Sequence, residues 1–243
     1  MNIIILQPSD KIDNNVYSIS DHRFEHLREI LKSEANDVVE IGLLNGPLGK
    51  AEIAEMNESE AVLKIKELET VKPEPITIDL ICALPRPQTL KKVLHTAAVM
   101  GVRNLYLIRS EKVEKSYFHS PLLNENNLSK HLIEGLSQGK RTAIPTVTIH
   151  DRFKRFFEEE LSLNTDSIGL LADPSSTTYL SVEMINSSNN IVIAIGPEGG
   201  WNDFEIELMR SKGFRTFKLS ESIMRVENAV TAALAQVELV KNR

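Results

Sequence analysis

The chain has 243 residues, 42% of them hydrophobic, and a formal net charge of −6 at pH 7. This length suffices for two modest domains or one large one. No stretch reaches the roughly 18 apolar residues of a membrane-spanning helix, and the start MNIIILQPSD lacks the basic region and cleavage site of a signal peptide, so the sequence argues against a membrane or secreted protein and predicts a soluble, cytoplasmic one.

The first 72 residues predict a small β-rich domain. A strand near residues 3–6 and a helix over residues 22–32 come first, and three strands follow, over residues 38–44, 49–56 and 61–68. The sequence Asn45-Gly46-Pro47 predicts a hairpin between the first two of these three strands. His22 and His26 lie one helical turn apart, but because no third ligand accompanies them we expect no metal site.

A stiff, polar break at VKPEP, residues 71–75, is tolerated neither in a helix nor in a central strand. We therefore predict two domains, residues 1–72 and 73–243. Beyond the break, apolar strands alternate with helices, which predicts an α/β fold with a mainly parallel sheet and helices on both faces. The expected strands cover residues 76–84, 104–108, 167–173, 191–195 and 216–219, and the expected helices cover residues 89–100 and 127–138.

The single cysteine, Cys82, belongs to the first of these apolar strands. It cannot form an internal disulfide, and no histidine is close to it in sequence. We expect a buried strand residue and not a reactive thiol.

Charge is unevenly distributed along the chain. Residues 73–155 carry a net charge of +6, whereas residues 1–72 and 156–243 each carry −6. Phosphate contacts depend on clustered Lys and Arg, so the middle segment is the part suited to RNA. A solvated face with scattered charges is an equally good interpretation. The basic candidates are Arg86, Lys91, Lys92, Arg103, Arg109, Lys112, Lys115, Lys140 and Arg141.

Two loops near the C-terminus predict one ligand site. The apolar run at residues 191–195 stops at Gly196-Pro197-Glu198-Gly199-Gly200, and a strand over residues 214–219 leads into Ser220-Glu221-Ser222 and a long helix. Ligands bind in the crevice outside the carboxyl ends of such strands, and glycines let the main chain approach a ligand closely. The patterns GxxxxGK[ST] and GxGxxG are absent, which argues against a triphosphate or dinucleotide site. By itself, GPEGG is also compatible with a simple tight turn.

The sequences IAIGPEGGW and LSESIMRVENAVTAAL together resemble the cofactor-binding signature of the knotted SPOUT RNA methyltransferases, in particular the small-subunit ribosomal RNA methyltransferase E family. The segment HLREILK at residues 26–32, followed by Asn36-Asp37 and a Gly46 turn, resembles the amino-terminal RNA-binding lobe of that family. Between them, Met100-Gly101-Val102 with Gln138, Arg141 and Pro145 fit more weakly.

The resemblance implies a trefoil-knotted sheet, a PUA-like N-terminal barrel, a homodimer, and S-adenosylmethionine bound in a bent shape at the knot. It implies methylation of N3 of a uridine in 16S rRNA, and we expect the substrate to be the assembled small ribosomal subunit because the chain is too acidic to grip naked RNA tightly. The implied cofactor-binding residues are Leu171, Ala172, Ile195, Gly196, Pro197, Glu198, Gly199, Gly200, Leu219, Ser220, Ser222, Ile223, Met224, Asn228 and Ala229. The implied RNA-binding residues are Arg28, Lys32, Arg86, Lys91, Lys92, Gln138 and Arg141.

Arg225 and Glu227 match the charged positions of the family motif and are the catalytic candidates. Uracil N3 holds a proton, so methylation needs a route for that proton and a positive group near the uracil oxygens. Arg225 would stabilise charge or position the target, because arginine stays protonated. Glu227 would orient Arg225, accept a proton or bind the N3–H group. A surface ion pair or a carboxylate complementing the helix dipole is the alternative.

Several positions depart from the family pattern and leave other functions open. Thr96, Val99, Ser137 and Ala143 stand where the family usually has charged residues. A relative with a different RNA target, or an RNA-binding protein without catalysis, is therefore the alternative function. The helix over residues 226–240 is apolar on nearly every side, which predicts either a dimer interface or a helix wrapped inside one subunit.

Overall fold

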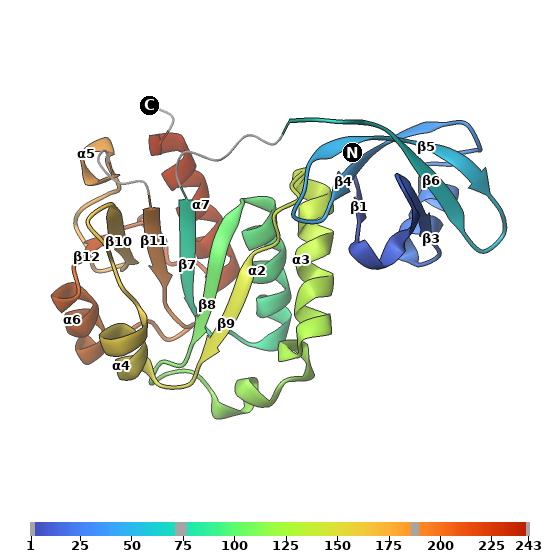
Figure 1. The fold of residues 1–243 in the computed structure, drawn as a ribbon. Helices are drawn as coiled ribbons and strands as arrows, with labels where there is room; N and C mark the ends of the chain where they lie inside the picture. The colour runs from blue at the N-terminus through green and yellow to red at the C-terminus, as the bar shows by residue number, and fades with distance from the viewer. Residues whose placement is uncertain (1–2, 71–76, 186–189, 242–243) are drawn as a thin grey trace. The chain divides into compact units, whose positions relative to one another are not determined.

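The computed structural model of the chain describes residues 3–70, 77–185 and 190–241. The chain divides into two compact units, Met1–Pro73 with Ile133–Ile144, and Glu74–Leu132 with Pro145–Arg243. The break expected at residues 71–75 lies outside the described residues. Within the described residues, each unit has its own six-stranded sheet (Figure 1).

The sheet of the first unit is mostly antiparallel. Its strands lie in the order β1-β4-β5-β6-β3-β2, with β1 and β4 parallel and the other neighbours antiparallel. The strands are β1 (Ile4–Leu6), β2 (Lys11–Asp13), β3 (Val16–Ile19), β4 (Val38–Leu43), β5 (Leu48–Met56) and β6 (Ala61–Leu68). The four strands expected here are confirmed, whereas β2 and β3 were not foreseen.

The hairpin expected at Asn45-Gly46-Pro47 is confirmed. The amide of Leu43 donates to the carbonyl of Pro47 at 3.0 Å, and the amide of Gly46 donates to the carbonyl of Leu43 at 2.7 Å. Asn45 has φ 58°, a left-handed conformation that asparagine tolerates better than most residues.

The helix expected over residues 22–32 is shorter than predicted. It consists of α1 (His22–Glu25) and a π-helical turn, η2 (His26–Ile30). Asp21 caps its start, because its carboxylate accepts from the amide of Arg23 at 2.9 Å. Lys32 has φ 51° and cannot continue the helix.

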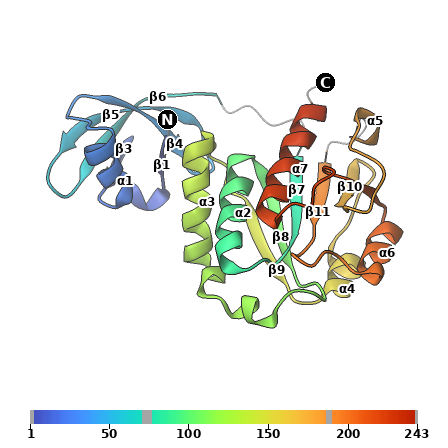
Figure 2. The ribbon, with the colours of Figure 1, turned by 180° about the vertical axis from the view of Figure 1, so that it is seen from behind.

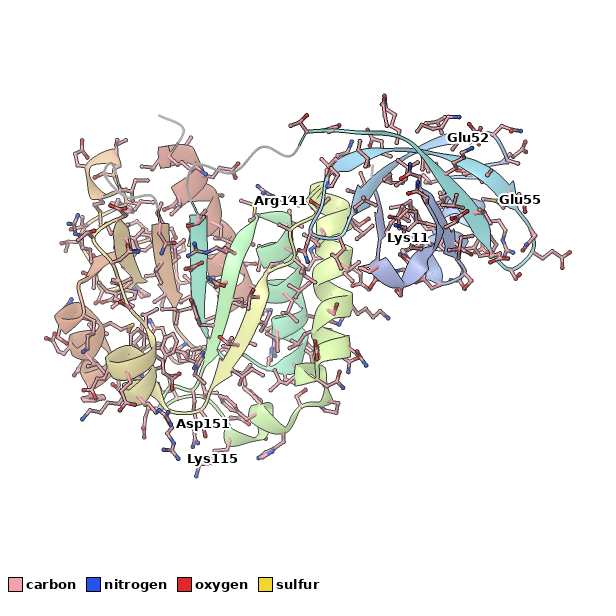
Figure 3. All side chains as sticks on the ribbon, in the orientation of Figure 1. Lys11, Glu52, Glu55, Lys115, Arg141 and Asp151 are labelled. Atoms are coloured by element: carbon pink, nitrogen blue, oxygen red, sulfur yellow. The ribbon has the colours of Figure 1, made fainter. Side chains whose placement is uncertain are left out.

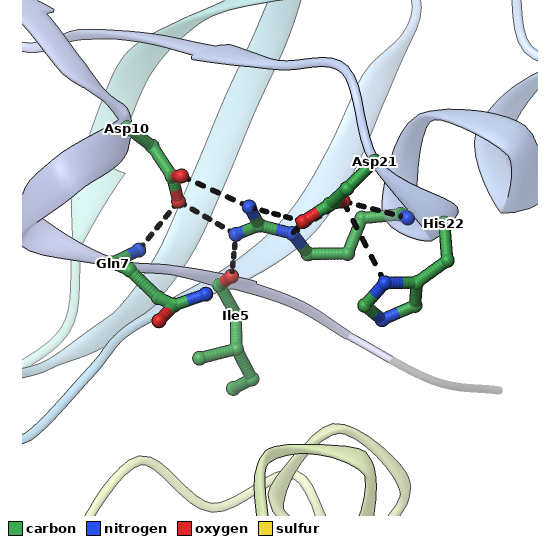
Figure 4. A network of polar contacts seen from close by, with 6 residues as sticks. Ile5, Gln7, Asp10, Asp21 and His22 are labelled. Carbon is green, nitrogen blue, oxygen red and sulfur yellow. Dashed lines mark hydrogen bonds and ion pairs between the residues drawn. The ribbon is translucent and has the colours of Figure 1, made fainter. Parts of the chain in front are cut away.

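A buried arginine ties the start of the chain to this helix (Figure 4). Arg23 is 8% exposed, and its guanidinium donates to Asp10, Asp21 and the carbonyl of Ile5 at 2.6 to 3.1 Å. The carboxylate of Asp10 also accepts from the amide of Gln7. Since every donor edge of the planar guanidinium has an acceptor, this charge can be buried.

The second unit has the parallel sheet that the sequence predicts. Its strands lie in the order β12-β10-β11-β7-β8-β9, and all neighbours are parallel. They are β7 (Thr77–Ala83), β8 (Val102–Ile108), β9 (Thr146–His150), β10 (Ser167–Ala172), β11 (Asn190–Ile195) and β12 (Phe214–Phe217). The five expected strands are confirmed, and β9 is an addition at the edge. Cys82 is fully buried in β7 as expected, and burial raises the pKa of its thiol to about 12.

Helices α2 (Pro87–Val99) and α7 (Val226–Lys241) lie side by side against one face of this sheet, toward the viewer in Figure 2. Helix α4 (Phe153–Arg155) lies toward the viewer in Figure 1, and the π-helical turn η5 (Phe156–Glu160) follows it. The remaining helices are α3 (Glu125–Gly139), α5 (Val182–Ile185) and α6 (Asp203–Ser211), with short 3-10 turns η1 (Pro8–Asp10), η3 (Lys115–His119) and η4 (Pro121–Leu123). In the described part of the chain, no helix combines the length and the apolar character needed to cross a membrane.

Helix α7 buries one stripe and exposes the other. Val230, Ala233, Leu234 and Val237 are fully buried within the unit. The opposite side is exposed and includes Leu239 at 56%. Packing inside one subunit therefore accounts for part of its apolar sequence.

Candidate functional site

Three neighbouring strand ends form a cavity in the second unit. Strands β12, β10 and β11 are adjacent and parallel, so the loops that follow them emerge at the same edge of the sheet. These loops and the first turn of α7 enclose a cavity of about 180 Å³. Its lining residues are Ala172, Asp173, Pro174, Ile195, Gly196, Pro197, Glu198, Gly200, Trp201, Ile206, Leu219, Ser220, Ser222, Ile223, Met224, Val226 and Ala229.

The loop after β11 depends on two glycines. The amide of Gly200 donates to the carbonyl of Pro197 at 2.9 Å, and Gly200 has φ 69°, a conformation that favours glycine. A Cβ atom at Gly196 would lie 3.1 Å from Nε1 of Trp201. Glycine at 196 therefore lets the indole ring pack directly against the main chain.

The loop after β12 is braced by its own hydroxyl groups and by α7. The hydroxyl of Ser220 accepts from the amide of Ser222 at 3.0 Å and donates to the Ser222 carbonyl at 2.8 Å. The side-chain amide of Gln236 on α7 donates to the carbonyl of Leu219 at 2.9 Å. Glu221 accepts hydrogen bonds from Tyr179 and Lys218, which lower the pKa of its carboxyl. The loop is thus held by residues that precede it in the chain and by α7.

The loop after β10 contributes Asp173 and Pro174, which the sequence had not singled out. Asp173 is 7% exposed, and its carboxylate accepts from the amide and the hydroxyl of Ser175 at 2.9 and 2.7 Å. Its own amide donates to the carbonyl of Phe217 at 3.0 Å. No glycine marks this turn, which is why the sequence pattern did not reveal it.

Arg225 and Glu227 flank the cavity-lining Val226 at the start of α7. Arg225 is exposed, whereas the Glu227 side chain is 11% exposed and pairs with Lys92 of α2 at 3.2 Å. Hydrogen bonding from its own backbone amide, together with Lys92 and Arg225, lowers the pKa of Glu227 against the opposing effect of burial. The structure thus joins a predicted catalytic carboxylate to a predicted RNA-binding lysine.

Three of the predicted cofactor residues do not line this cavity. Leu171 is fully buried within β10, and Asn228 is exposed on α7. The carbonyl of Gly199 accepts from Nζ of Lys112 at 2.8 Å. These positions shape the surrounding loops and strands, and the other predicted cofactor residues are brought together around the cavity.

Glu205 of α6 is a further residue that the sequence analysis missed. Its carboxylate is 2% exposed and accepts from the amide of Asn202 at 3.0 Å and from the amide of Glu111, in the loop after β8, at 2.7 Å. Asn202 in turn accepts from the amide of Glu205 at 2.8 Å, which completes a capping box. The Asn-x-x-Glu spacing after the glycine loop is the signal that could have identified it.

The basic candidates fall into different parts of the molecule. Arg109, Lys112 and Lys115 follow the carboxyl end of β8, and Figure 3 shows Lys115 and Asp151 at the end of the sheet where β8 and β9 finish. Arg86 precedes α2 and donates to Thr89 at 3.2 Å. Lys91, like Lys92, is exposed on α2.

Arg103, another of the basic candidates, lies away from the cavity. It lies near the amino end of β8 and forms an ion pair at 2.6 Å with the buried Asp79 of β7. It also donates to Asn190, the first residue of β11. This arginine therefore belongs to a polar cluster at the opposite end of the strands.

The other RNA-binding candidates belong to the first unit. Arg28 donates to the carbonyl of Glu58, pairs with Glu29 and lies 5.1 Å from the ring centre of Phe24. Lys140 pairs with Glu40 at 2.6 Å. The remaining members are Lys32, Gln138 and Arg141, of which Lys32 and Gln138 are exposed and Arg141 is partly buried.

Within the described ranges, no three His, Cys, Asp or Glu side chains are grouped so that they could hold a metal ion. The cavity is lined by loop backbone and by apolar side chains, and the charged Arg225 and Glu227 adjoin its lining residue Val226 at the start of α7.

Comparison with known proteins assigns the chain to a family. The profile of the RNA methyltransferase domain family matches residues 72–238. Ribosomal RNA small subunit methyltransferase E of Treponema pallidum is 29% identical over 98% of this chain and 90% of its own length. Ribosomal RNA small subunit methyltransferase E 1 of Borreliella burgdorferi is 30% identical over 89% of each chain.

Solved structures share the fold. The crystal structure of a ribosomal RNA small subunit methyltransferase E from Neisseria gonorrhoeae bound to S-adenosyl methionine superposes with a TM-score of 0.80, at 20% identity, over 99% of this chain and 98% of that one. A methyltransferase from Legionella pneumophila, in complex with the same cofactor, has a TM-score of 0.77 at 20% identity over 98% of each chain. Taken with the sequence matches over most of its length, these findings show that the chain belongs to the ribosomal RNA small subunit methyltransferase E family of RNA methyltransferases.

Proposed function

We propose that the protein transfers a methyl group from S-adenosylmethionine to N3 of a uridine in 16S rRNA, with the small ribosomal subunit as substrate. The observation that carries this proposal is the cavity at the carboxyl ends of three parallel strands, with Arg225 and Glu227 on either side of its lining residue Val226 in the chain. The names of the relatives and the cofactor in the Neisseria gonorrhoeae structure support it.

The residues of the cavity fit a nucleoside with an extended tail. Ile195, Leu219 and Val226 supply apolar wall, and the small side chains of Ala172 and Ala229 leave room beside them. Glycine backbone in the loop after β11 allows close approach of a flat ring. When bound, S-adenosylmethionine supplies a methyl group already activated on a sulfonium, so the protein needs mainly to align the two reactants.

Arg225 provides the positive charge of the proposed mechanism. The uracil anion carries its charge on O2 and O4, and a guanidinium beside these oxygens stabilises that charge as it develops. Arg225 is exposed and adjoins two cavity-lining residues, Met224 and Val226, so a target base at the mouth of the cavity is within its reach. It cannot serve as the base, because arginine stays protonated.

In the proposed mechanism, Glu227 is the residue that binds the N3–H group of the uracil. Its lowered pKa keeps it a carboxylate at neutral pH, and a carboxylate only accepts hydrogen bonds. Such a group can accept the hydrogen bond of N3–H, orient the base and take up the N3 proton as the bond from N3 to the methyl carbon forms and the bond from sulfur to that carbon breaks. The carboxyl then passes the proton to solvent. Lys92 fixes the position of Glu227, so we propose that it supports the carboxylate in addition to contacting RNA.

The remaining features implied by the resemblance belong to the proposal. They are the trefoil knot, the homodimer and the RNA-binding roles of Arg28, Lys32, Arg86, Lys91, Lys92, Gln138 and Arg141. The basic residues after β7 and β8 support the RNA assignment, because they emerge at the same edge of the sheet as the cavity. The exposed stripe of α7 is the surface proposed for the homodimer.

A pair of alanines provides the test of the cofactor site. Ala229 of α7 lines the cavity, whereas Ala54 of β5 is exposed and does not line it. Ala229→Leu fills space that the ligand needs and should weaken binding of S-adenosylmethionine and of its demethylated product by about tenfold or more in calorimetric titration. Ala54→Leu should bind as the wild type does. If neither ligand binds the wild-type protein, the proposed function is wrong.

A further inference from the structure

Trp201 carries a buried hydrogen-bond donor that has no partner in the described residues. It is the single tryptophan of the chain, it is 8% exposed, and its Nε1–H donates to no hydrogen-bond acceptor there. Buried polar groups are nearly always paired, and an indole N–H usually finds an acceptor. An unpaired donor of this kind is expected where a ligand supplies the missing acceptor.

The ring that carries this donor lies at the wall of the cavity described above. Trp201 lines the cavity together with Gly196, and the Nε1 edge of the indole is the part nearest to Gly196, 3.1 Å from where a Cβ atom would be. On its other side the ring packs 5.9 Å from the ring of Phe153. The next residue, Asn202, is fixed by the capping box with Glu205. The indole is therefore held in place before any ligand arrives.

We propose that the Trp201 indole N–H donates a hydrogen bond to an acceptor atom of the bound adenosyl cofactor. This inference rests on the proposed function and adds a specific binding residue to it. S-adenosylmethionine offers acceptors on its adenine ring, its ribose hydroxyls and its carboxylate. Trp201 thus recognises the ligand through a polar contact, in addition to forming the wall behind the glycine loop.

A single tryptophan makes this contact directly observable, because the ¹⁵N-labelled protein gives one indole N–H signal in NMR. Titration with S-adenosylhomocysteine, the demethylated product, should move that proton downfield and slow its exchange with solvent, both saturating together with the calorimetric heat. Repeating the titration with adenosine and with methionine identifies the half of the ligand that carries the acceptor. An indole signal that keeps its exchange rate at full saturation would overturn the proposal.

Trp201→Phe removes the donor and keeps an aromatic ring. One neutral hydrogen bond corresponds to a loss of affinity of about 3- to 10-fold. The control is Phe204→Leu, since Phe204 is 59% exposed on α6, which follows Trp201 in the chain, and does not line the cavity. The affinity of this variant should match that of the wild type. Equal affinity of Trp201→Phe and wild type would contradict the hydrogen bond.

The two proposals fail in different ways. No binding of either ligand to the wild-type protein would overturn the proposed function and the Trp201 contact together. Binding that leaves the indole signal and the Trp201→Phe affinity unchanged would overturn the contact alone.

Discussion

At the scale of single residues, Arg23 is the residue on which the first unit most depends. Its guanidinium is buried and holds two carboxylates and a strand carbonyl together. Replacing it with methionine keeps the length of the side chain but leaves the Asp10 carboxylate, 10% exposed, without its cation. Breaking a buried pair from one side costs about 3–5 kcal/mol.

We therefore expect Arg23→Met to lower the free energy of unfolding of the first unit by that amount, as measured by amide hydrogen exchange of β1 and β4 in increasing urea. Arg28→Met is the matched control, because Arg28 is 44% exposed and its pair with Glu29 is a surface one, worth about 1 kcal/mol or less. Similar effects of the two substitutions would show that the Arg23 network does not stabilise the unit.

The same network makes the first unit sensitive to acid. Burial raises the pKa of Asp21, but the hydrogen bonds and charge of Arg23 outweigh it and hold that pKa below 3.8. A carboxyl whose pKa is lowered by folding contributes stability above its unfolded pKa and loses it as the pH falls through the folded value. The free energy of unfolding should therefore drop as the pH goes below 3.8.

Asp21→Asn should show a smaller drop over the same range and a lower stability at pH 7. Asparagine still caps the helix, so the difference reports the charge and not the cap. The exposed Asp13, changed to asparagine, serves as control. Identical pH profiles for wild type and Asp21→Asn in chemical denaturation would contradict this explanation.

At the scale of elements, the capping box of α6 joins two loops around the cavity. Glu205 accepts from amides of Asn202 and Glu111, which belong to the loops after β11 and β8. Glu205→Gln replaces one accepting oxygen by an NH₂ group, and a buried amide left without an acceptor costs about 1–3 kcal/mol. Glu207→Gln changes an exposed carboxylate on the same helix, 70% exposed, and should cost about 0.5 kcal/mol or less.

Thermal unfolding and hydrogen exchange of the Glu111 backbone amide test this prediction. The Glu205→Gln protein should unfold at a lower temperature, and its Glu111 amide should exchange faster than in Glu207→Gln. An unchanged Glu111 amide would mean that Glu205 does not hold the β8 loop.

The elements that could be predicted from the sequence are those with a long apolar run or with clear turn residues at their ends. The strands of the parallel sheet are buried on both faces, so each reads as a continuous apolar run bounded by polar residues. The edge strands β2 and β9 were missed, as was β3, the neighbour of β2. Lys11–Asp13 is three exposed residues, and Thr146–His150 is mostly exposed, so neither has a pattern that differs from a loop.

The position of Ser137 shows why a family pattern cannot be carried over residue by residue. Its hydroxyl donates to the carbonyl of Ile3 at 2.5 Å, and its carbonyl accepts from the Ile3 amide at 3.1 Å. Ser137, which stands where the family usually has a charged residue, thus holds Ile3 in place within the first unit. Sequence alone gave no sign of this contact, because the partners are 134 residues apart.

At the scale of the whole molecule, most of the residues that line the cavity could be predicted from the sequence, and the pairing of their two loops has a topological reason. Loops at the carboxyl ends of parallel strands meet at one edge, which placed the glycine loop and the serine loop together. The sequence could not show which strands are neighbours. The order β12-β10-β11 brings in the loop after β10, and with it Asp173 and Pro174. The unpartnered indole of Trp201 likewise depends on packing that no spacing reveals.

The net charge of −6 is also understood only for the whole molecule. Basic residues of the second unit follow β7 and β8 at the edge that holds the cavity, while Arg103 is neutralised at the opposite end of the strands. A local basic edge on an acidic protein suits a large, structured RNA particle better than free RNA.

Methyl transfer to the small ribosomal subunit is the most direct test of this account. Purified protein, labelled S-adenosylmethionine and small subunits that lack the modification should yield N3-methyluridine in 16S rRNA, detected by nuclease digestion and mass spectrometry. Arg225→Ala should reduce the rate about 100- to 1,000-fold while cofactor affinity is retained, and Arg210→Ala, an exposed arginine of α6, should not. The absence of N3-methyluridine with a cofactor-bound, folded wild-type protein would contradict the proposed function.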